Sequence, residues 1–199
     1  MPRVSDEHLA NRRRQILDAA RTCFLRNGFH ATSMQDVIAE AGLSVGAVYR
    51  YFKSKNDIVT AIAEEVVGGV NEAIGGLVAQ DLPMTEVVKR ALGFVDAQTG
   101  PQGVFRLAIQ VWAEAMRDPA LAKFVNGAYS RIRGNFVELA RKAQKRGELP
   151  KTADPEAVGA VLFGLMPAYA LQRVLTGTPD RATFLAGLTA LLERPTVKA

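Results

Sequence analysis

The sequence has few of the residues that build covalent or metal-bound frameworks. It contains one cysteine, Cys23, and two histidines, His8 and His30, among 199 residues. A single cysteine cannot form an internal disulfide, and this set of residues offers no spacing typical of a zinc site. We therefore expect a protein of a reducing compartment without metal or cofactor, in which Cys23 is a small buried hydrophobic residue.

Long uncharged stretches are also missing. The longest, residues 157–172, is shorter than the roughly 20 residues that a membrane span needs, and it contains Pro167. No apolar segment near the N-terminus has the pattern of a signal peptide. These observations predict a soluble, cytoplasmic protein with no membrane partner.

No segment alternates apolar and polar residues with the two-residue period of a strand. Apolar residues recur instead at helical spacing, and Asp118-Pro119 and Asp154-Pro155 are typical helix starts. We expect about nine helices. The fold class is therefore all-α, and the length suits one or two domains.

One stretch, residues 33–55, has the pattern of two short helices joined by a tight turn. Ser33 and Asp36 form a capping-box pair at the start of the first helix, and Gly42 suits its C-terminus. Ser44 can cap the second helix. This pattern is typical of a helix-turn-helix motif, whose second helix enters the major groove of DNA.

Positive charge is concentrated in the same part of the chain. Residues 1–55 hold nine Lys and Arg against five Asp and Glu, a net charge of +4 within a formal total of +5. The second helix and the residues after it bring together Tyr49, Arg50, Tyr51, Lys53 and Lys55. Such an uneven charge is the electrostatic footprint expected of a protein that binds nucleic acid.

The residues around this motif resemble the tetracycline-repressor (TetR) family of bacterial transcription regulators. The resemblance covers about residues 13–62 and is carried by Ile16-Leu17-Asp18-Ala19-Ala20, Asn27-Gly28-Phe29, Thr32-Ser33, Ala41-Gly42-Leu43-Ser44, Gly46-Ala47-Val48-Tyr49-Arg50-Tyr51-Phe52 and Lys53-Ser54-Lys55. It implies a helix-turn-helix DNA-binding domain over residues 1–55 and a helical effector-binding and dimerisation domain over residues 56–199. It also implies a ligand-responsive repressor that binds a palindromic operator of double-stranded DNA as a homodimer and is associated with the nucleoid.

The resemblance further implies which positions contact DNA. They are Thr32, Ser33, Gln35, Val45, Gly46, Ala47, Tyr49, Arg50, Tyr51 and Lys55. By their chemistry, Arg50 suits a guanine edge and Gln35 an adenine edge. Val45 and Ala47 can meet a thymine methyl group, and Gly46 allows close backbone approach. The remaining hydroxyl, phenol and ammonium groups are assigned to phosphates.

Residues 42–46, Gly-Leu-Ser-Val-Gly, match the nucleophile elbow of α/β-hydrolases. An elbow needs a strand before its serine and a histidine later in the chain. Residues 34–41 have helical spacing instead, and both histidines precede Ser44. We therefore expect no enzyme, and catalysis through Ser44 is the weaker alternative hypothesis.

The C-terminal helices are rich in aromatic residues and methionine. Such residues more often form core, but the resemblance implies a pocket for a small, largely apolar or aromatic effector. Candidate pocket residues are Phe94, Phe105, Ile109, Trp112, Met116, Tyr129, Phe136, Met166, Tyr169 and Arg173. Gln110 and Glu114 could add polar groups, although an ion pair is the simpler role for Glu114. A regulator with no small-molecule ligand, controlled by a protein partner or by its abundance, stays an alternative.

The last two expected helices carry more apolar residues than one buried face needs. Paired with a second copy about a two-fold axis, they would form a four-helix interface. Candidate interface residues are Leu162, Leu171, Leu175, Phe184, Leu188 and Leu191. The simpler alternative is that these helices cover the core of their own domain.

Overall fold

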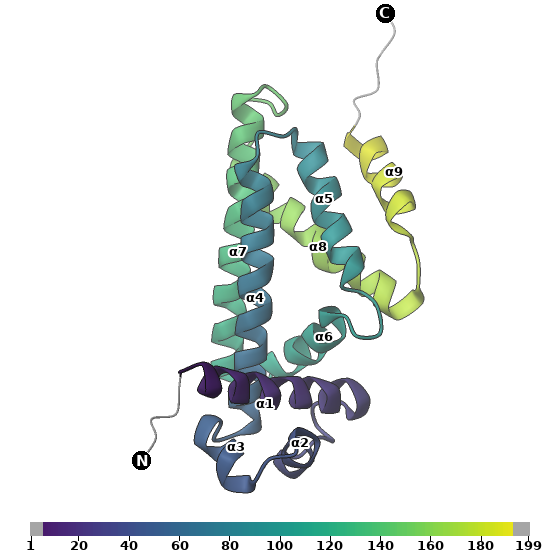
Figure 1. The fold of residues 1–199 in the computed structure, drawn as a ribbon. Coiled ribbons are helices and arrows are strands. Elements are labelled where there is room, and N and C mark those ends of the chain that lie inside the picture. Colours follow the sequence, from purple (N-terminus) through teal and green to yellow (C-terminus); the bar gives the residue numbers. More distant parts are fainter. Residues whose placement is uncertain (1–5, 193–199) are drawn as a thin grey trace, which may run out of the picture. The chain divides into compact units, whose positions relative to one another are not determined.

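The computed structural model describes residues 6–192, which form helices and their connections (Figure 1). The helices are α1 (Asp6–Asn27), α2 (Met34–Ala41), α3 (Val45–Tyr51), α4 (Lys55–Ala79), α5 (Met84–Ala97), α6 (Val104–Ala115), α7 (Pro119–Lys145), α8 (Pro155–Thr176) and α9 (Arg181–Leu192). Within the described range there are nine helices and no strand, which confirms the all-α prediction.

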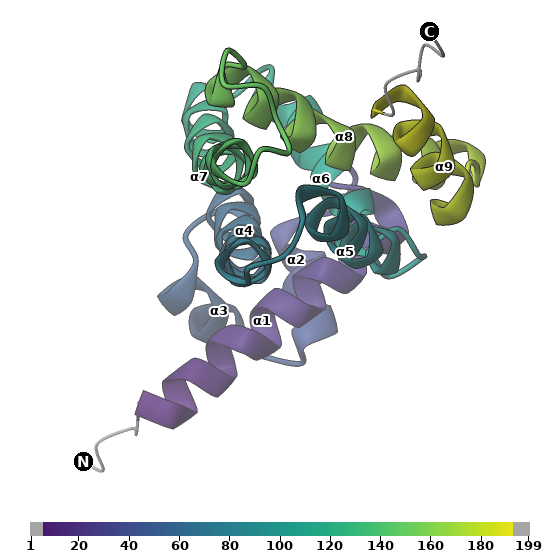
Figure 2. The same ribbon diagram turned by 90° about the horizontal axis from the view of Figure 1, so that it is seen from above.

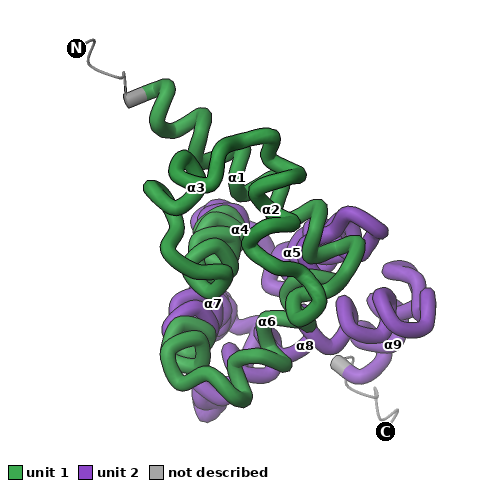
Figure 3. Tube along the Cα trace, turned by 90° about the horizontal axis from the view of Figure 1, so that it is seen from below, with its two compact units in different colours: residues 1–69, 106–126 green, residues 70–105, 127–199 purple. Residues whose placement is uncertain are grey.

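The chain forms two compact units (Figure 3). The first contains the residues up to Gly69 together with Arg106–Asn126, and the second contains Val70–Phe105 together with the residues from Gly127 onward. Helices α4 and α7 each contribute to both units. These packing units differ from the functional division expected at residue 55, which concerns DNA and effector binding and stays a prediction.

The core of the first unit is built on the apolar stripe of α1. Ile16, Leu17, Ala20 and Cys23 recur at three- and four-residue spacing and are fully buried. The stripe packs with Val37 of α2 and with buried residues of α3 and α4. Burial raises the pKa of the Cys23 thiol, as expected for a residue that serves as a hydrophobic filler.

The core of the second unit joins the last part of α4 with α5, α7 and α8. Its buried residues are Ile74, Val78, Met84, Val87, Val88, Ala91, Leu92, Val95, Phe136, Leu139, Ala143, Leu162, Met166, Tyr169 and Ala170. Residues 70–79 of α4 lie beside α7 (Figures 1 and 2), where the Asn135 side-chain amide donates to the Asn71 side-chain oxygen at 2.9 Å. Gly159 of α8 faces the backbone of Val137, and a Cβ there would lie only 2.7 Å from the Val137 nitrogen. Glycine therefore permits a close approach of α7 and α8.

Helix α8 is the one described helix whose length and composition would suffice to cross a membrane. The uncharged run expected to be too short for a span belongs to this 22-residue helix. Leu162, Met166 and Tyr169 of α8 are nevertheless buried in the core of the second unit. Its apolar character is thus used, at least in part, for packing inside the protein.

Candidate nucleic-acid interface

Helix α2 begins with the capping box expected from the sequence. The Ser33 hydroxyl accepts a hydrogen bond from the Asp36 backbone N–H, and the Asp36 carboxylate accepts from the Ser33 backbone N–H at 2.7 Å. The bonds that the Ser33 backbone N–H and hydroxyl donate to the carboxylate lower the pKa of the Asp36 carboxyl. The N-terminus of α2 is therefore fixed, with the Gln35 side chain exposed beside it.

The turn to α3 also follows the sequence prediction. Gly42 ends α2 in the left-handed conformation, with φ of 62°, which glycine adopts without steric cost. Ser44 then caps α3, because its hydroxyl accepts from the Ala47 backbone N–H at 3.3 Å. Ser44 thus follows a helix and serves as a helix cap, which is not the setting of a nucleophile elbow.

Helix α3 has one buried and one exposed side. Val48 is fully buried and Phe52, just after the helix, nearly so, and both belong to the core of this unit. On the other side Val45 is 58% exposed and Tyr49 38% exposed, and Arg50 is exposed as well. Gly46 is exposed, and Ala47 and Tyr51 are half-buried. The short helix therefore presents an aromatic hydroxyl and a guanidinium to solvent.

Thr32 does not occupy the position expected of a phosphate contact. Its side chain is 1% exposed, and its hydroxyl donates to the carbonyl oxygen of Gly28 at 2.8 Å. A buried and bonded hydroxyl is not available to DNA, so assigning this side chain to a phosphate was wrong. Thr32 instead holds the loop that precedes α2.

The Lys55 side chain differs from its expected role in a similar way. Its ammonium donates to the carbonyl oxygens of Phe29 at 2.6 Å and Thr32 at 2.8 Å, and it lies 4.3 Å from the centre of the Phe29 ring. Desolvation lowers the pKa of this ammonium, and the charge of Glu114 opposes that effect. Because its donors are already bonded to the loop, the Lys55 side chain links the start of α4 to the loop before α2 and does not point toward a phosphate.

Comparison with known proteins bears on both parts of the chain. The family model described as bacterial regulatory proteins of the tetR family matches residues 16–62. A second model, described as the C-terminal part of a BetI-type transcriptional repressor, matches residues 87–195, more than half of the chain. The chain belongs to the TetR family. It is accordingly a ligand-responsive, DNA-binding transcriptional regulator of the repressor type, a class that normally has no enzymatic activity.

Individual relatives of this TetR-family chain resemble it over almost its whole length. The HTH-type transcriptional regulator UidR of Escherichia coli (strain K12) is 26% identical over 184 residues, 90% of each chain. Among solved structures, a putative transcriptional regulator from Saccharomonospora viridis in complex with choline has a TM-score of 0.77 at 23% identity, covering 94% of this chain and 97% of the other. FadR from Bacillus subtilis in complex with stearoyl-CoA has a TM-score of 0.75 at 21% identity, covering 90% and 96%.

The candidate effector residues of this TetR-family chain do not all belong to one compact unit. Ile109, Trp112 and Met116 lie in the first unit, and Met116 is 82% exposed. The other seven are Phe94, Phe105, Tyr129, Phe136, Met166, Tyr169 and Arg173, and they lie in the second unit. Phe136, Met166 and Tyr169 are buried core residues, and the rings of Tyr129 and Phe163 pack edge to face with centroids 4.9 Å apart. Burial raises the pKa of the Tyr129 hydroxyl.

A polar network connects α5 and α8 inside the second unit. The Tyr169 hydroxyl donates to the Asp96 carboxylate at 2.5 Å, and the Arg173 Nε atom lies 3.3 Å from the same carboxylate oxygen. Burial, followed by the bond to Asp96, raises the pKa of Tyr169 to about 12. Arg173 is therefore held by an internal carboxylate and by the Gly177 carbonyl oxygen, and it does not simply extend into solvent.

The candidate dimer residues differ in how far they are exposed. Leu171, Leu175 and Leu191 are exposed, the last two at 69% and 85%. Phe184 and Leu188 are half-buried against the core, and the Phe184 ring lies 4.9 Å from that of Tyr169. Leu162 is buried within its own unit, so counting it as an interface residue was wrong.

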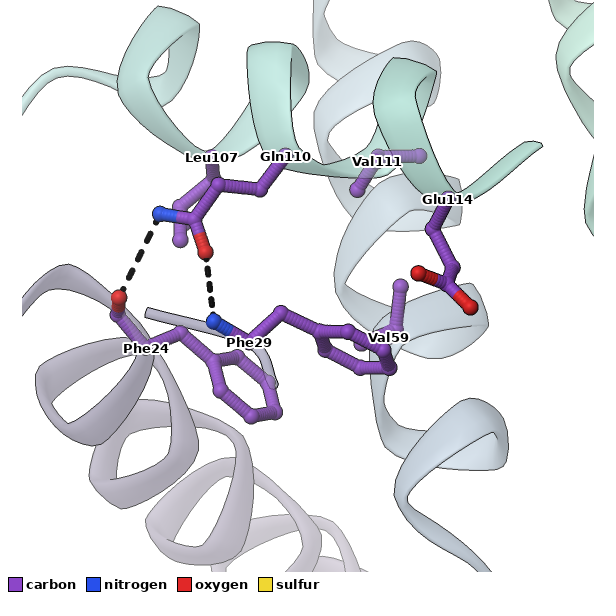
Figure 4. Close-up of a pocket in the computed structure, with 7 residues that line it drawn as sticks. All are labelled: Phe24, Phe29, Val59, Leu107, Gln110, Val111 and Glu114. Carbon is purple, nitrogen blue, oxygen red and sulfur yellow. Dashed lines mark hydrogen bonds between the residues drawn. The ribbon is translucent and has the colours of Figure 1, made fainter. Parts of the chain in front are cut away.

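The small pocket found in the first unit involves residues other than those expected (Figure 4). It is lined by Phe24, Phe29, Val59, Leu107, Gln110, Val111 and Glu114, and it has room for little more than one water molecule. Gln110 and Glu114 were expected as polar additions to an effector pocket, with an ion pair as the simpler role for Glu114. The Glu114 carboxylate lies 3.1 Å from the His30 ring nitrogen Nε2, as that simpler role requires. Within the described residues, no group of three histidine, cysteine or acidic side chains could hold a metal ion.

Proposed function

We propose that this regulator binds a palindromic operator through the exposed side of α3 and the N-terminus of α2. The observation that carries this proposal is that α3 buries Val48 while it exposes Val45, Tyr49 and Arg50 on a unit held rigid by its own core. A helix whose buried side is packed into the core and whose exposed side carries cationic and aromatic side chains is suited to entering a major groove.

The proposed contacts follow the chemistry of each side chain. Arg50 reads a guanine edge and Gln35 an adenine edge, while Val45 and Ala47 meet thymine methyl groups. Tyr49, Tyr51 and Ser33 contact phosphates, and Gly46 lets the backbone approach. Thr32 and Lys55 do not contact DNA in this proposal. They stabilise the surface indirectly, through their hydrogen bonds to the loop before α2.

We further propose that the protein acts as a homodimer in the cytoplasm, associated with the nucleoid. The exposed leucines Leu171 and Leu175, one turn apart on α8, and Leu191 of α9 support pairing with a second copy, because burying their apolar surface against a partner removes it from water. Two recognition helices about 34–36 Å apart would then read the half-sites of one operator.

The effector is proposed to bind among the helices of the second unit and to be small and largely apolar or aromatic. The relatives crystallised with choline and with stearoyl-CoA support a ligand site in this family. Phe94, Phe105 and Tyr129 provide half-buried aromatic surface, and Arg173 adds a cation held near Asp96. The ligand can release DNA only to the extent that it binds the non-DNA-binding conformation more tightly.

Selection of bound duplexes from random-sequence DNA tests the proposal and identifies the operator sequence in the same experiment. We expect enrichment of an inverted repeat whose binding weakens steeply as salt rises, because phosphate contacts release counterions. Recovery of no common sequence, together with binding that does not depend on salt, would overturn the proposed function.

A further inference from the structure

The loop of residues 28–33, which leads from α1 into α2, is held by a side chain from a distant part of the chain. We propose that Gln110 of α6 is a positioning residue for DNA binding, which fixes this loop and so makes operator affinity depend on α6. The inference rests on the proposed function, and it concerns a residue outside the helix-turn-helix motif.

The Gln110 carboxamide uses both of its ends (Figure 4). Its oxygen accepts a hydrogen bond from the Phe29 backbone N–H at 2.7 Å, and its nitrogen donates to the Phe24 carbonyl oxygen at 3.3 Å. Only this orientation of the amide satisfies both bonds. One side chain therefore joins the last turn of α1 to the loop that follows it.

The backbone at Phe29 is held from both sides. Gln110 binds its N–H, while the ammonium of Lys55 binds its carbonyl oxygen at 2.6 Å. Phe29 follows Gly28, whose φ of 82° turns the chain out of α1. Because Ser33, the cap of α2, lies only four residues further on, these bonds fix the path of the chain just before α2.

The face of α6 around Gln110 is matched to this loop. Glu114, one turn later, lies 3.1 Å from the His30 ring nitrogen Nε2, and its charge also acts on Lys55. Leu107 and Val111 complete the face and line the small pocket together with the Phe29 ring. A displacement of α6 would have to break polar bonds and expose apolar surface at the same place.

Chain connectivity makes α6 one of the elements through which changes in the second unit can reach the first. Residues 106–126 pack with the first unit, yet they are joined by peptide bonds at both ends to residues of the second unit, Phe105 and Gly127. The half-buried aromatic residues proposed for the effector belong to that second unit. Rearrangement there on ligand binding would therefore pull on the segment that carries Gln110.

Gln110→Met tests the role because it keeps the length and helix preference of the side chain but removes both hydrogen bonds. Gln144→Met is the matched control. Gln144 also fastens a loop from a helix, since its amide donates to the carbonyl oxygens of Pro150, Lys151 and Ala153, but this loop lies in the second unit. Each variant is compared with the wild-type chain for three properties: affinity for the selected duplex, amide hydrogen exchange at residue 29 and thermal midpoint.

We expect Gln110→Met to weaken binding roughly tenfold, because the free energy lost should be about that of one hydrogen bond. We also expect it to accelerate exchange of the Phe29 amide. Gln144→Met should lower the thermal midpoint but bind DNA as the wild type does. Equal affinities of the two variants would overturn the inference, whether both are weak or both unchanged.

A measurement on the wild-type chain keeps the inference testable if Gln110→Met fails to fold. By linkage, the selected duplex should slow exchange of the Phe29 amide, since DNA binding and an ordered loop favour each other. Unchanged exchange would contradict the inference. Failure of the wild-type chain to bind any duplex would instead defeat the proposed function, so the two failures are distinguishable.

Discussion

The ammonium nitrogen of Lys55 lies 2.8 Å from the carbonyl oxygen of Thr32. This bond joins the start of α4 to the residue just before the cap of α2, and it engages a charge that would otherwise be free to meet a phosphate. Lysine and threonine thus both support the DNA-binding surface from within.

Lys55→Met should therefore lower stability without changing the electrostatic part of DNA binding. We expect a loss of about 1–2 kcal/mol in the free energy of unfolding, from the hydrogen bonds and the contact with the Phe29 ring. The slope of log K against log salt should stay unchanged. Lys53→Met, which removes the same charge from an exposed side chain nearby, is the control. A decrease of about 0.9 in the magnitude of the slope for Lys55→Met alone would show that Lys55 contacts a phosphate after all.

Gly159→Ala should destabilise the protein by overpacking. The new methyl group would lie 2.7 Å from backbone atoms of Val137, and backbone cannot move as easily as a flexible side chain. We expect a cost of about 1–3 kcal/mol in chemical denaturation. Gly134→Ala is the matched control on α7, where nothing lies within 4 Å, and it should stabilise the helix by up to about 1 kcal/mol.

Stability at alkaline pH should depend on Tyr169. Because its pKa is raised to about 12 from an ordinary value of 10, the folded chain holds this proton more tightly than the unfolded chain does. The corresponding stabilisation is complete below pH 10 and is lost as the pH rises toward 12. Tyr169→Phe should flatten this part of the stability curve, measured by denaturation at a series of pH values, and an unaltered pH dependence would contradict the assignment.

Leu175→Glu should convert the proposed dimer to a monomer, because it places a charge in the exposed apolar surface of α8. Sedimentation equilibrium measures the change directly. Met116→Glu alters another exposed apolar residue, in the first unit, and should leave the dimer intact. A monomeric wild-type protein, or a dimer unaffected by Leu175→Glu, would count against pairing through α8 and α9.

Local signals in the sequence predicted local structure well. Ser33, Gly42, Ser44 and the Asp-Pro pairs act within three or four residues, and the caps that they predict at α2, α3, α7 and α8 are present. These features depend on chain neighbours, whose spacing the sequence displays directly.

Contacts between distant residues could not be read in the same way. The family resemblance placed Thr32 and Lys55 among the DNA contacts, and their residue types suggested phosphates. Their hydroxyl and ammonium are instead engaged by carbonyl groups brought near by folding. The link from Gln110 to Phe29 spans 81 positions, and no spacing rule predicts it. A glutamine amid the apolar residues of α6 was the only signal, and it suggested a pocket.

Base discrimination by Arg50 tests the central claim most directly. The wild-type chain and Arg50→Ala are titrated by fluorescence anisotropy against the selected duplex and each of its single-base-pair variants. We predict that Arg50→Ala loses about 1–3 kcal/mol of discrimination at one base pair in each half-site and keeps the remaining preferences. A variant that discriminates at every position as the wild type does would show that α3 does not read the DNA through Arg50.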